Sequence, residues 1–365
     1  MDTHRLDRNR LTMHPLSSRT NRADIERDHT KPGAEPRVLK DGEERVFAEL
    51  ILRVRAAREK GAPVVIAFGA HTIKNGLAPV LIELMEGGWL SHLATNGAGI
   101  IHDWEFAFAG QSSEHVAPNV ADGTFGNWEE TGLFINLAIL VGAYEGRGYG
   151  ESVGRMIEEE SLDIPSEDAL KDAAHAEVDN DSERAAAAID LLGQVRAFSL
   201  PAGRMDVAHA WKPFSAQAAA YRLGLPLTGH PMIGHDIIYN HPMNHGAAIG
   251  RTALRDFLLF ARTISEIDGG VYLSIGSAVM SPMIFEKSMS MAQNLAAQEG
   301  RRVANHFITV VDLAESKWDW SRGEPLEDDP AYYLRFNKSF SRMGGTLRYL
   351  QMDNRDFLLH LAQNL

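Results

Sequence analysis

The chain has 365 residues, of which 44% are hydrophobic and 23% are charged, and its net charge is -13. This apolar content is enough for one large domain or two smaller ones, and it excludes a chain that is disordered as a whole. The negative charge argues against nucleic acid as a partner. The absence of cysteine excludes disulfides, thiolate nucleophiles and Cys-ligated zinc.

The first 42 residues are polar and show no clean period, so we predict an extended N-terminal arm, residues 1–42, that packs on a neighbouring subunit. The N-terminus lacks a signal-peptide pattern, and no run approaches the roughly 18 apolar residues of a membrane span. We therefore expect a cytoplasmic protein without a membrane partner. The arginines of the arm are interspersed with acidic residues: Arg5, Arg8, Arg10, Arg19, Arg22 and Arg27.

A βαβ unit is predicted directly after the arm. Apolar residues recur at helical spacing over about 43–60, and the continuous apolar run Val64–Phe68 is typical of a strand buried on both faces of a parallel sheet. A loop over 71–76, a helix up to Gly87-Gly88 and a second strand over Leu90–Ala94 follow.

Further strands are predicted over 270–275 and 307–311, with short ones near 225–227 and 347–350. The region around 145–200 carries acidic runs and an Ala-rich stretch, which indicate surface helices. The predicted fold is a single α/β domain, residues 43–365: a mostly parallel, Rossmann-like sheet flanked by helices, with a helical acidic insertion. Glycine or small residues follow three of the four best strands, at the edge where such sheets bind ligands.

The glycines after these strands are candidates for holding a phosphate group. Glycine lets a pyrophosphate approach unpaired backbone N–H groups at a helix N-terminus closely. None of the turns spells the G-x-G-x-x-G or P-loop motif, so the indication lies in their recurrence at several strand ends. The glycines concerned are Gly69, Gly76, Gly97, Gly99 and Gly276.

Ionisable residues cluster just past the second strand, between Asn96 and Glu105. Such residues at a strand end are typical of a site built on a rigid sheet. His102 is a candidate acid or base, and Asp103 or Glu105 could bind a ribose hydroxyl. The alternative is a helix N-terminus whose dipole favours acidic residues.

A second cluster holds four histidines, His230, His235, His241 and His245, together with Asp236. Neutral imidazole is a common metal ligand, but the spacings match no H-E-x-x-H or facial-triad pattern. A histidine acting as general base is favoured over a metal. The segment Ser112–His115 offers pieces of a Ser-His-acid hydrolase, yet the chain has no G-x-S-x-G elbow.

The stretch from Val64 to Glu105 resembles the deoxyhypusine synthase family in its order of strand, loop, helix, strand and glycine turn. Residues 236–241 are similar to the family's D-M-I-F-F-H segment, which places His241 on the family's active-site histidine. The resemblance implies NAD at the strand ends and a homotetramer with sites near subunit interfaces. The dinucleotide neighbours implied by it are His71, Thr72, Asn75, Gly76, Asn96, Ala98, Gly99, Asp103, Gly276, Ser277, Ala278 and Asp312.

The sequence departs from this family at its catalytic lysine, which falls on Ser281, and a hydroxyl cannot form a Schiff base. The family's site tryptophan and a substrate-binding glutamate fall on Phe336 and Tyr332. A genuine deoxyhypusine synthase is therefore excluded. Lysines that could act from another direction are Lys74, Lys287 and Lys338.

The function predicted from the sequence is that of an NAD-dependent oxidoreductase or transferase acting on a small polar substrate, with amines among the candidates. His241 and His102 are the expected acid/base residues, while Asp236 and Glu105 would orient them or hold a cationic group. The alternatives are a hydrolase or lyase that uses the same crevice, with or without a His-bound metal, and a non-catalytic NAD-binding protein.

Overall fold

The computed structural model describes residues 6–365, so Arg5 of the predicted arm lies outside the described residues. Six parallel strands form the main sheet, in the order β10-β9-β8-β2-β3-β7. Counted along the chain, this is 6-5-4-1-2-3, the doubly wound order of a Rossmann-like sheet, and the order reverses between β2 and β8. The predicted α/β fold class is confirmed. The strands are β2 (Val64–Phe68), β3 (His92–Asn96), β7 (Leu227–His230), β8 (Val271–Ile275), β9 (Phe307–Asp312) and β10 (Thr346–Gln351).

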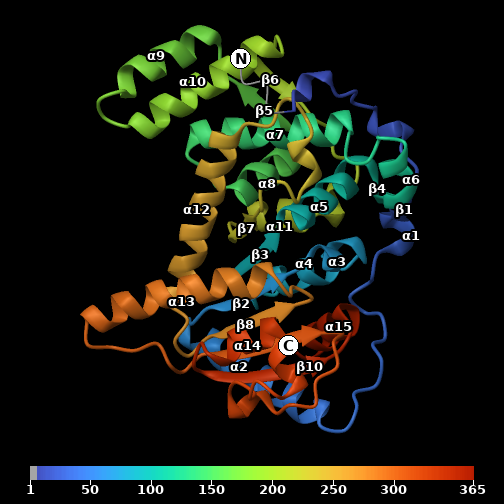
Figure 1. Cartoon of the computed structure of the whole chain (residues 1–365), viewed down its shortest axis with the longest axis vertical. Helices are drawn as coiled ribbons and strands as arrows, with labels where there is room; N and C mark the ends of the chain where they lie inside the picture. Colours follow the sequence, from blue (N-terminus) through green and yellow to red (C-terminus); the bar gives the residue numbers. More distant parts are fainter. Residues whose placement is uncertain (1–5) are drawn as a thin grey trace.

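Successive side chains of β2 enter two different cores, one on each face of the sheet. Val64, Ile66 and Phe68 belong to one buried cluster, and Val65 and Ala67 belong to the other. Because neighbouring side chains of a strand point to opposite faces, a continuous apolar run is the pattern that such a central strand requires. The first face is covered by α2 (Glu43–Lys60), α4 (Ala78–Glu86), α5 (Gly97–Ala109) and α15 (Asn354–Asn364), and the second by α12 (Gly246–Ser265), α13 (Met280–Gln298) and α14 (Arg335–Ser341) (Figure 1).

The predicted helix over 43–60 and the strand over 64–68 have the bounds expected, but β3 begins two residues later than predicted. Leu90 is buried, which gives the apolar signal, yet it belongs to the connection before the strand. Pairing with β2 starts only at Ser91, whose N–H donates to the carbonyl of Val64 (2.9 Å).

The region predicted as solvated acidic helices is only partly so. In α8 (Tyr149–Glu159), Val153, Met156 and Ile157 are fully buried at helical spacing, so this helix packs into the core. Between the helices lies a small antiparallel pair of strands that the sequence did not indicate, because the two strands are short and largely polar. The elements of this region are α7 (Glu129–Glu145), α8, β5 (Ser161–Ile164), α9 (Glu167–Glu177), α10 (Ser182–Ala197) and β6 (Gly203–Asp206).

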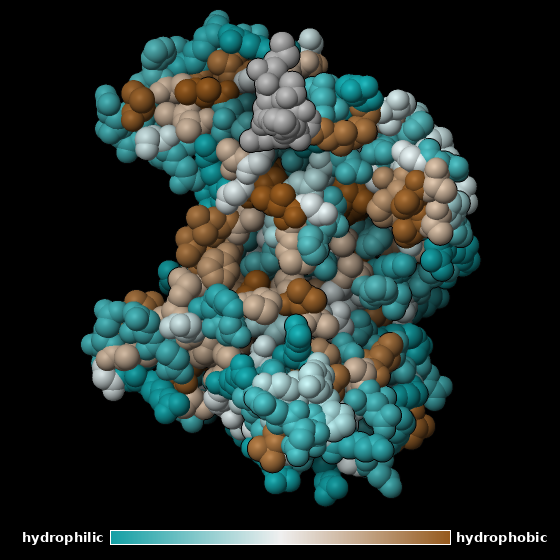
Figure 2. Space-filling view, viewed as in Figure 1, coloured by the Kyte–Doolittle hydropathy of each residue, from teal (hydrophilic) through white to brown (hydrophobic). Residues whose placement is uncertain are grey.

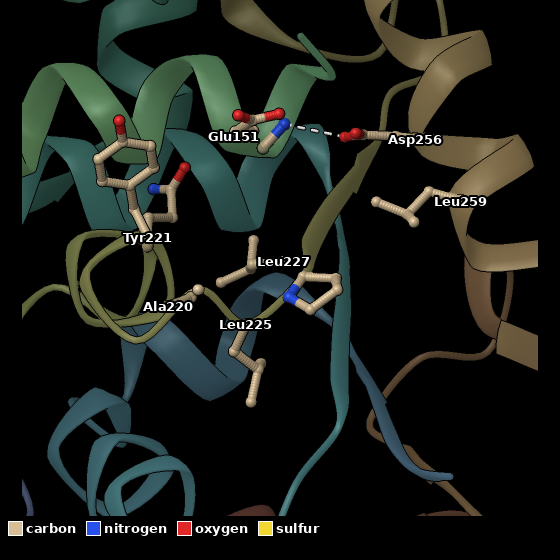
Figure 3. Close-up of a pocket in the computed structure, with 11 residues that line it drawn as sticks. Glu151, Ala220, Tyr221, Leu225, Leu227, Asp256 and Leu259 are labelled. Carbon is tan, nitrogen blue, oxygen red and sulfur yellow. Dashed lines mark hydrogen bonds between the residues drawn. The ribbon is translucent and has the colours of Figure 1, made fainter.

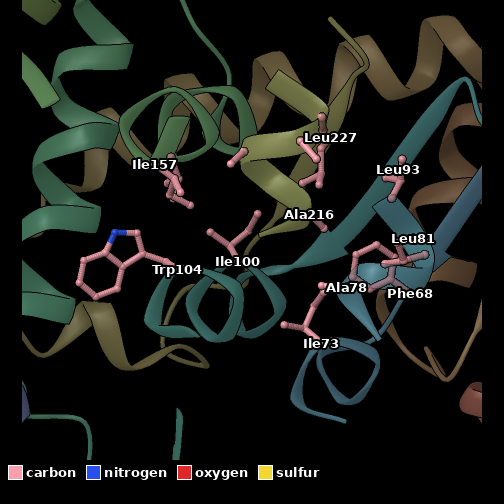
Figure 4. Packing of buried hydrophobic residues seen from close by; sticks show 14 of the residues in the cluster. Phe68, Ile73, Ala78, Leu81, Leu93, Ile100, Trp104, Ile157, Ala216 and Leu227 are labelled. Carbon is pink, nitrogen blue, oxygen red and sulfur yellow. The ribbon is translucent and has the colours of Figure 1, made fainter. Parts of the chain in front are cut away.

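The core under α5 joins this region to the sheet. Ile100 and Trp104 lie one turn apart on α5, close to Ile157 of α8, Ala216 of α11 and Leu227 of β7 (Figure 4). Each fully buried side chain of this size contributes about 1.5–3 kcal/mol relative to exposure. The short helices around the core are α3 (Ala70–Lys74), α6 (Val116–Ala121), α11 (Ala216–Arg222), η3 (Lys212–Phe214) and η4 (Ile237–Tyr239), and the C-terminal region adds η5 (Trp320–Arg322) and η6 (Pro330–Tyr333).

The described part of the N-terminal arm packs on its own chain. Leu16 and Ile25 are buried, and β1 (Asn21–Asp24) pairs antiparallel with β4 (Gln111–Glu114). The other short elements of the arm are η1 (Arg8–Arg10), η2 (Leu16–Ser18) and α1 (Ile25–Asp28). The arm is therefore part of this chain's fold, and packing against a neighbouring subunit stays a prediction. Within residues 6–365, no helix has the length and apolar composition of a membrane span.

Candidate functional site

The turns that follow β2 and β8 touch each other where the strand order reverses. The N–H of Gly69 donates to the carbonyl of Ile275 (3.1 Å). A Cβ at position 69 would lie 2.1 Å from the carbonyl oxygen of Gly276, so only glycine fits there. Because all six strands are parallel, the turns after β2, β3 and β8 share one edge of the sheet, as a dinucleotide crevice would require.

Glycine is required in these turns for a different physical reason from the phosphate contact inferred from the sequence. A Cβ on Gly97 would lie 2.2 Å from Oδ2 of Asp236, and one on Gly99 would lie 2.1 Å from Oγ1 of Thr95. Gly76, with a positive φ of 72°, packs against the backbone of the arm at Asp28. Protein atoms thus occupy the space that was expected to admit a pyrophosphate, and close internal packing explains these glycines.

The outward surface at the reversal point is apolar. Val279 and Leu313, which follow β8 and β9, are 58% and 68% exposed, and Ala278 is also exposed. Helix α13 starts at Met280 without a side-chain cap at its N-cap residue, Val279. Ser277 takes the N–H of Ser281 in the first turn (3.2 Å) and Pro282 has no N–H, so the N–H of Met280 is the one that this turn leaves without a side-chain partner.

The other predicted dinucleotide neighbours on this edge differ in their exposure and in whether they already form hydrogen bonds. His71 and Asn75 are exposed. Thr72 is buried and accepts a hydrogen bond from Nδ2 of Asn354 (3.1 Å). Ser277 accepts from the N–H of Ser281, and Asp312 from the N–H of Ala314. Only the exposed residues are open to a ligand without rearrangement.

A cavity of about 220 Å³ lies beside this edge, where α3 and α5 meet the arm. It brings together Ala98, His102, Glu105 and Asp236, four residues that the sequence had singled out in two separate segments. Its complete lining is Arg19, Arg22, Lys74, Ala98, Ile101, His102, Glu105, Ser113, Glu114, Val116, Phe125, His235, Asp236 and Ile237.

A directed chain of hydrogen bonds fixes the tautomer of His102. Ser112 donates its hydroxyl proton to Oε2 of Glu105 (2.6 Å), so its oxygen accepts from Nδ1–H of His102 (2.7 Å). The other ring nitrogen, Nε2, is then unprotonated and has no hydrogen-bond partner among the described residues. His102 therefore presents a free lone pair to the cavity.

Electrostatics keep this imidazole neutral. Burial lowers the pKa of His102 to about 4, and the positive charges of Lys74 and Arg19 act in the same direction against the raising effect of Glu105. At neutral pH the ring is thus a hydrogen-bond acceptor and a proton acceptor of low basicity.

Glu105 is not a free base. Both of its oxygens accept from the guanidinium of Arg19 at 2.7 Å, and Ser112 and Thr131 donate to it as well. Burial raises the pKa of Glu105, but the ion pair with Arg19 and the hydrogen bonds outweigh burial and leave the pKa below its usual range. Glu105 anchors the arm and orients Ser112.

Asp236 is the least satisfied acidic group in the cavity. Its Oδ2 is buried against Gly97 and has no hydrogen-bond partner within residues 6–365. Burial raises the pKa of Asp236 to about 7, a shift that a backbone hydrogen bond at Met232 only partly offsets. A half-buried carboxyl with one unpaired, buried oxygen would gain from a cationic or hydrogen-donating ligand.

Two cations complete the cavity. Lys74 is half-buried and Arg22 is exposed, and neither forms an ion pair with any residue of the described chain. The cavity thus offers positive charge, a neutral imidazole and one unpaired carboxyl within one small volume.

The structure places three other predicted site residues elsewhere. His241 is 2% exposed, accepts from the N–H of Met243 (3.0 Å) and lies 3.4 Å from Glu129. Asp103 is buried under the N-terminus of α11, where the N–H groups of Ala216 and Gln217 donate to it. Asn96 caps α5 by accepting from the N–H of Gly99 (2.9 Å). None of the three lines the cavity.

The four clustered histidines do not converge. His230 bonds Thr228 (2.9 Å), His235 is exposed, and His245 lies near Asp190 (3.8 Å). In the described part of the chain, no three His, Cys, Asp or Glu side chains are grouped closely enough to hold a metal ion.

Sequence reasoning missed Arg19, Arg22 and Ser112 as parts of the site. Arg19 is 86 residues away from its partner Glu105, and nothing local distinguishes it from the other arginines of the arm. Ser112 was noted as a hydrolase fragment, and its short spacing from His102 and Glu105 was the available signal.

The fold and the cavity define a doubly wound α/β protein with a pocket at the C-terminal edge of its sheet, lined by several ionisable residues. No family model and no curated protein matches the chain. Solved structures found to be similar include ArgZ, an arginine dihydrolase from the ornithine-ammonia cycle in cyanobacteria, at 14% identity, TM-score 0.42, over 90% of this chain and 33% of that one.

Two further structures are AgrE in a ternary complex with ornithine and NAD+, and a conserved putative LOR/SDH protein from Methanococcus maripaludis S2. AgrE is 14% identical, with a TM-score of 0.42, over 90% of this chain and 34% of its own. The LOR/SDH protein is 13% identical, with a TM-score of 0.42, over 92% and 73%. The chain therefore spans about a third of the length of ArgZ and AgrE.

The resemblance to deoxyhypusine synthase is wrong, because the structural neighbours are these proteins. Ser281, at the position matched to the family's lysine, is fully buried and shares a hydrogen bond with the hydroxyl of Tyr272 (2.9 Å), so this position faces the core. Lys338 lies over the ring of Tyr332 (3.5 Å) and Lys287 pairs with Glu286, whereas Lys74 lines the cavity.

Proposed function

We propose that the chain is an NAD-dependent enzyme that acts on a small polar substrate carrying an amino group. The observation that carries this proposal is the reversal of strand order between β2 and β8. The His102 cavity, lined by residues that follow β2, β3 and β7, lies at the same edge of the sheet. Doubly wound sheets bind dinucleotides in the crevice at this reversal.

The residues at the reversal fit a dinucleotide in two respects. The N-terminus of α13 leaves the N–H of Met280 for a phosphate oxygen, since Ser277 takes the N–H of Ser281 and Pro282 has none, and the exposed Val279 and Leu313 offer apolar surface to a flat ring. The N-terminus of α5 is a poorer phosphate site, because Asn96 and the carboxyl of Asp236 already occupy it. NAD bound here would supply a hydride acceptor.

The side chains of the cavity divide into complementary roles. Asp236 would hold the ammonium group of the substrate, and Lys74 with Arg22 would hold an anionic group. His102, with Nε2 free and Nδ1–H fixed by Ser112, would take the proton that leaves the substrate as its amine-bearing carbon is oxidised. Arg19 and Glu105 would act through Ser112 by keeping this tautomer.

The test is turnover with a panel of amino compounds, followed by absorbance at the reduced-nicotinamide band. His102→Gln should lower kcat roughly 10²–10⁴-fold, the usual contribution of a general acid or base. His175→Gln, on the exposed surface of α9, is the matched control and should leave turnover unchanged.

Dinucleotide binding is measured separately by thermal shift with NAD and NADP, since a ligand of the native state raises its stability. No shift with either dinucleotide would refute the cofactor assignment. Turnover without any change at the nicotinamide band would instead indicate a lyase or hydrolase in the same cavity.

A further inference from the structure

A second cavity, of about 240 Å³, lies between α8, α11, the start of β7 and α12 (Figure 3). Leu225 and Leu227, which line it, stand at the N-terminal end of β7, whereas the turns of the candidate site follow the C-terminal ends of the strands. The two cavities are therefore at opposite edges of the sheet, and this one plays no part in the function proposed above.

One side of the cavity is apolar. Ala220, Leu225, Leu227 and Leu259 line it, and Figure 3 shows their side chains below and beside the open space. Leu259 is 42% exposed and lies on α12, along which apolar surface borders a hollow of the molecule (Figure 2). A ligand of this cavity would therefore carry an aliphatic portion.

The other side gathers hydrogen-bond acceptors. Glu151 and Asp256 contribute carboxyl groups, and no Lys, Arg or His is among the described residues that line the cavity. Glu151 pairs with Arg147 (2.6 Å) at the surface, whereas Asp256 is 2% exposed and has no ion pair within residues 6–365.

Asp256 is held in place by backbone groups alone. Its Oδ2 accepts from the N–H of Gly150 (2.8 Å) and of Gly229 (2.6 Å), which tie α8 and β7 to α12. Burial raises the pKa of Asp256 to about 7, and these hydrogen bonds offset only part of the effect. A cation beside this carboxyl would relieve the penalty of ionising it.

Gln217 provides an independent observation. It lines the cavity and is 2% exposed, and its Nε2 donates to the carbonyl of Ile100 and to Asp103, which settles the orientation of the amide. Its Oε1 is buried and has no hydrogen-bond partner in the described chain. A buried acceptor without a donor is uncommon in native proteins, and a bound N–H group would satisfy it.

We infer that this cavity is a second ligand site, for a short alkylammonium compound whose ammonium group meets Asp256, Glu151 and Gln217 and whose aliphatic chain lies on the leucines. The volume is below that of drug-sized pockets, so the ligand is a small metabolite.

Isothermal titration of the full chain with n-butylammonium tests the inference, with n-butanol and butyrate as matched probes without the positive charge. Butylammonium should bind at least about tenfold more tightly than either. Leu259→Trp, which fills the mouth of the cavity, should weaken butylammonium binding by a similar factor. Leu254→Trp, at an exposed position on the same helix, is the control and should have no effect.

Two further variants separate this site from others. Glu151→Gln, at an exposed position, should weaken butylammonium without affecting folding. Glu266→Gln, an exposed carboxylate just past α12 that does not line the cavity, is the matched control and should leave the affinity unchanged. Equal binding of butanol and butylammonium, or loss of binding in Glu266→Gln with retention in Leu259→Trp, would overturn the inference.

Discussion

Replacing Arg19 by methionine should destabilise the protein strongly, because it leaves the carboxylate of Glu105 buried without its cation. The two side chains are each 1% exposed and form two parallel bonds of 2.7 Å. Removing one partner of a buried ion pair typically costs about 3–5 kcal/mol. The hydroxyls of Ser112 and Thr131 would still donate to Glu105, so we expect the lower part of this range.

The loss of stability in Arg19→Met should also depend on pH, in a direction that follows from the pKa of Glu105. With Arg19 present, the pKa of Glu105 is depressed by an ion pair that outweighs burial, so Glu105 stabilises the fold above its unfolded pKa and loses this effect as pH falls. In Arg19→Met, burial alone raises the pKa, so the variant should lose stability as pH rises above the unfolded value of about 4.3. The destabilisation should therefore be larger at pH 8 than at pH 5.

Urea unfolding followed by tryptophan fluorescence at the two pH values measures both effects. Arg22→Met, on the exposed part of β1, is the control and should change stability by less than about 0.5 kcal/mol. The double variant Arg19→Met, Glu105→Met should recover much of the loss, since no charge is then left unpaired. Equal stability of Arg19→Met and Arg22→Met, or a loss that grows towards pH 5, would refute the reasoning.

Three other expectations follow from particular contacts. Gly69→Ala should destabilise the fold by about 1–3 kcal/mol, because its methyl group would overlap the backbone of the turn after β8; Gly193→Ala, in the open middle of α10, should instead stabilise it by up to about 1 kcal/mol in thermal unfolding. The folded pKa of Asp236 is raised, so this carboxyl stabilises the fold below its unfolded pKa and loses that contribution as pH rises. Asp236→Asn should therefore reduce the fall in the free energy of unfolding between about pH 4 and 7. If the variant kept the same fall, another group would be its cause. Ser112→Ala should free the ring of His102 to change tautomer, which the nitrogen chemical shifts of the imidazole report; unchanged shifts would show that Ser112 does not fix it.

The local pattern of the sequence was enough to place the central strands and several helices. Val64–Phe68 could be recognised because a strand buried on both faces must be apolar at every position, and residues 43–60 because one helical face is buried. His102 and Asp236 were found because polar groups past a strand end usually lie in a crevice. The prediction for His241 followed a family resemblance that the structural neighbours contradict.

The tertiary structure decided everything that depends on which segments meet. The strand order, with its reversal between β2 and β8, cannot be read from the strands themselves, because a continuous apolar run indicates a central strand without telling which strands lie beside it. Glu105 and Asp103, two candidate acids, form their hydrogen bonds with residues more than 80 positions away, Glu105 with Arg19 and Asp103 with Ala216. These partners make both carboxyl groups structural. The periodicity of apolar residues in the sequence indicates which residues are buried. Which buried charge forms an ion pair or hydrogen bond is determined only by the tertiary structure.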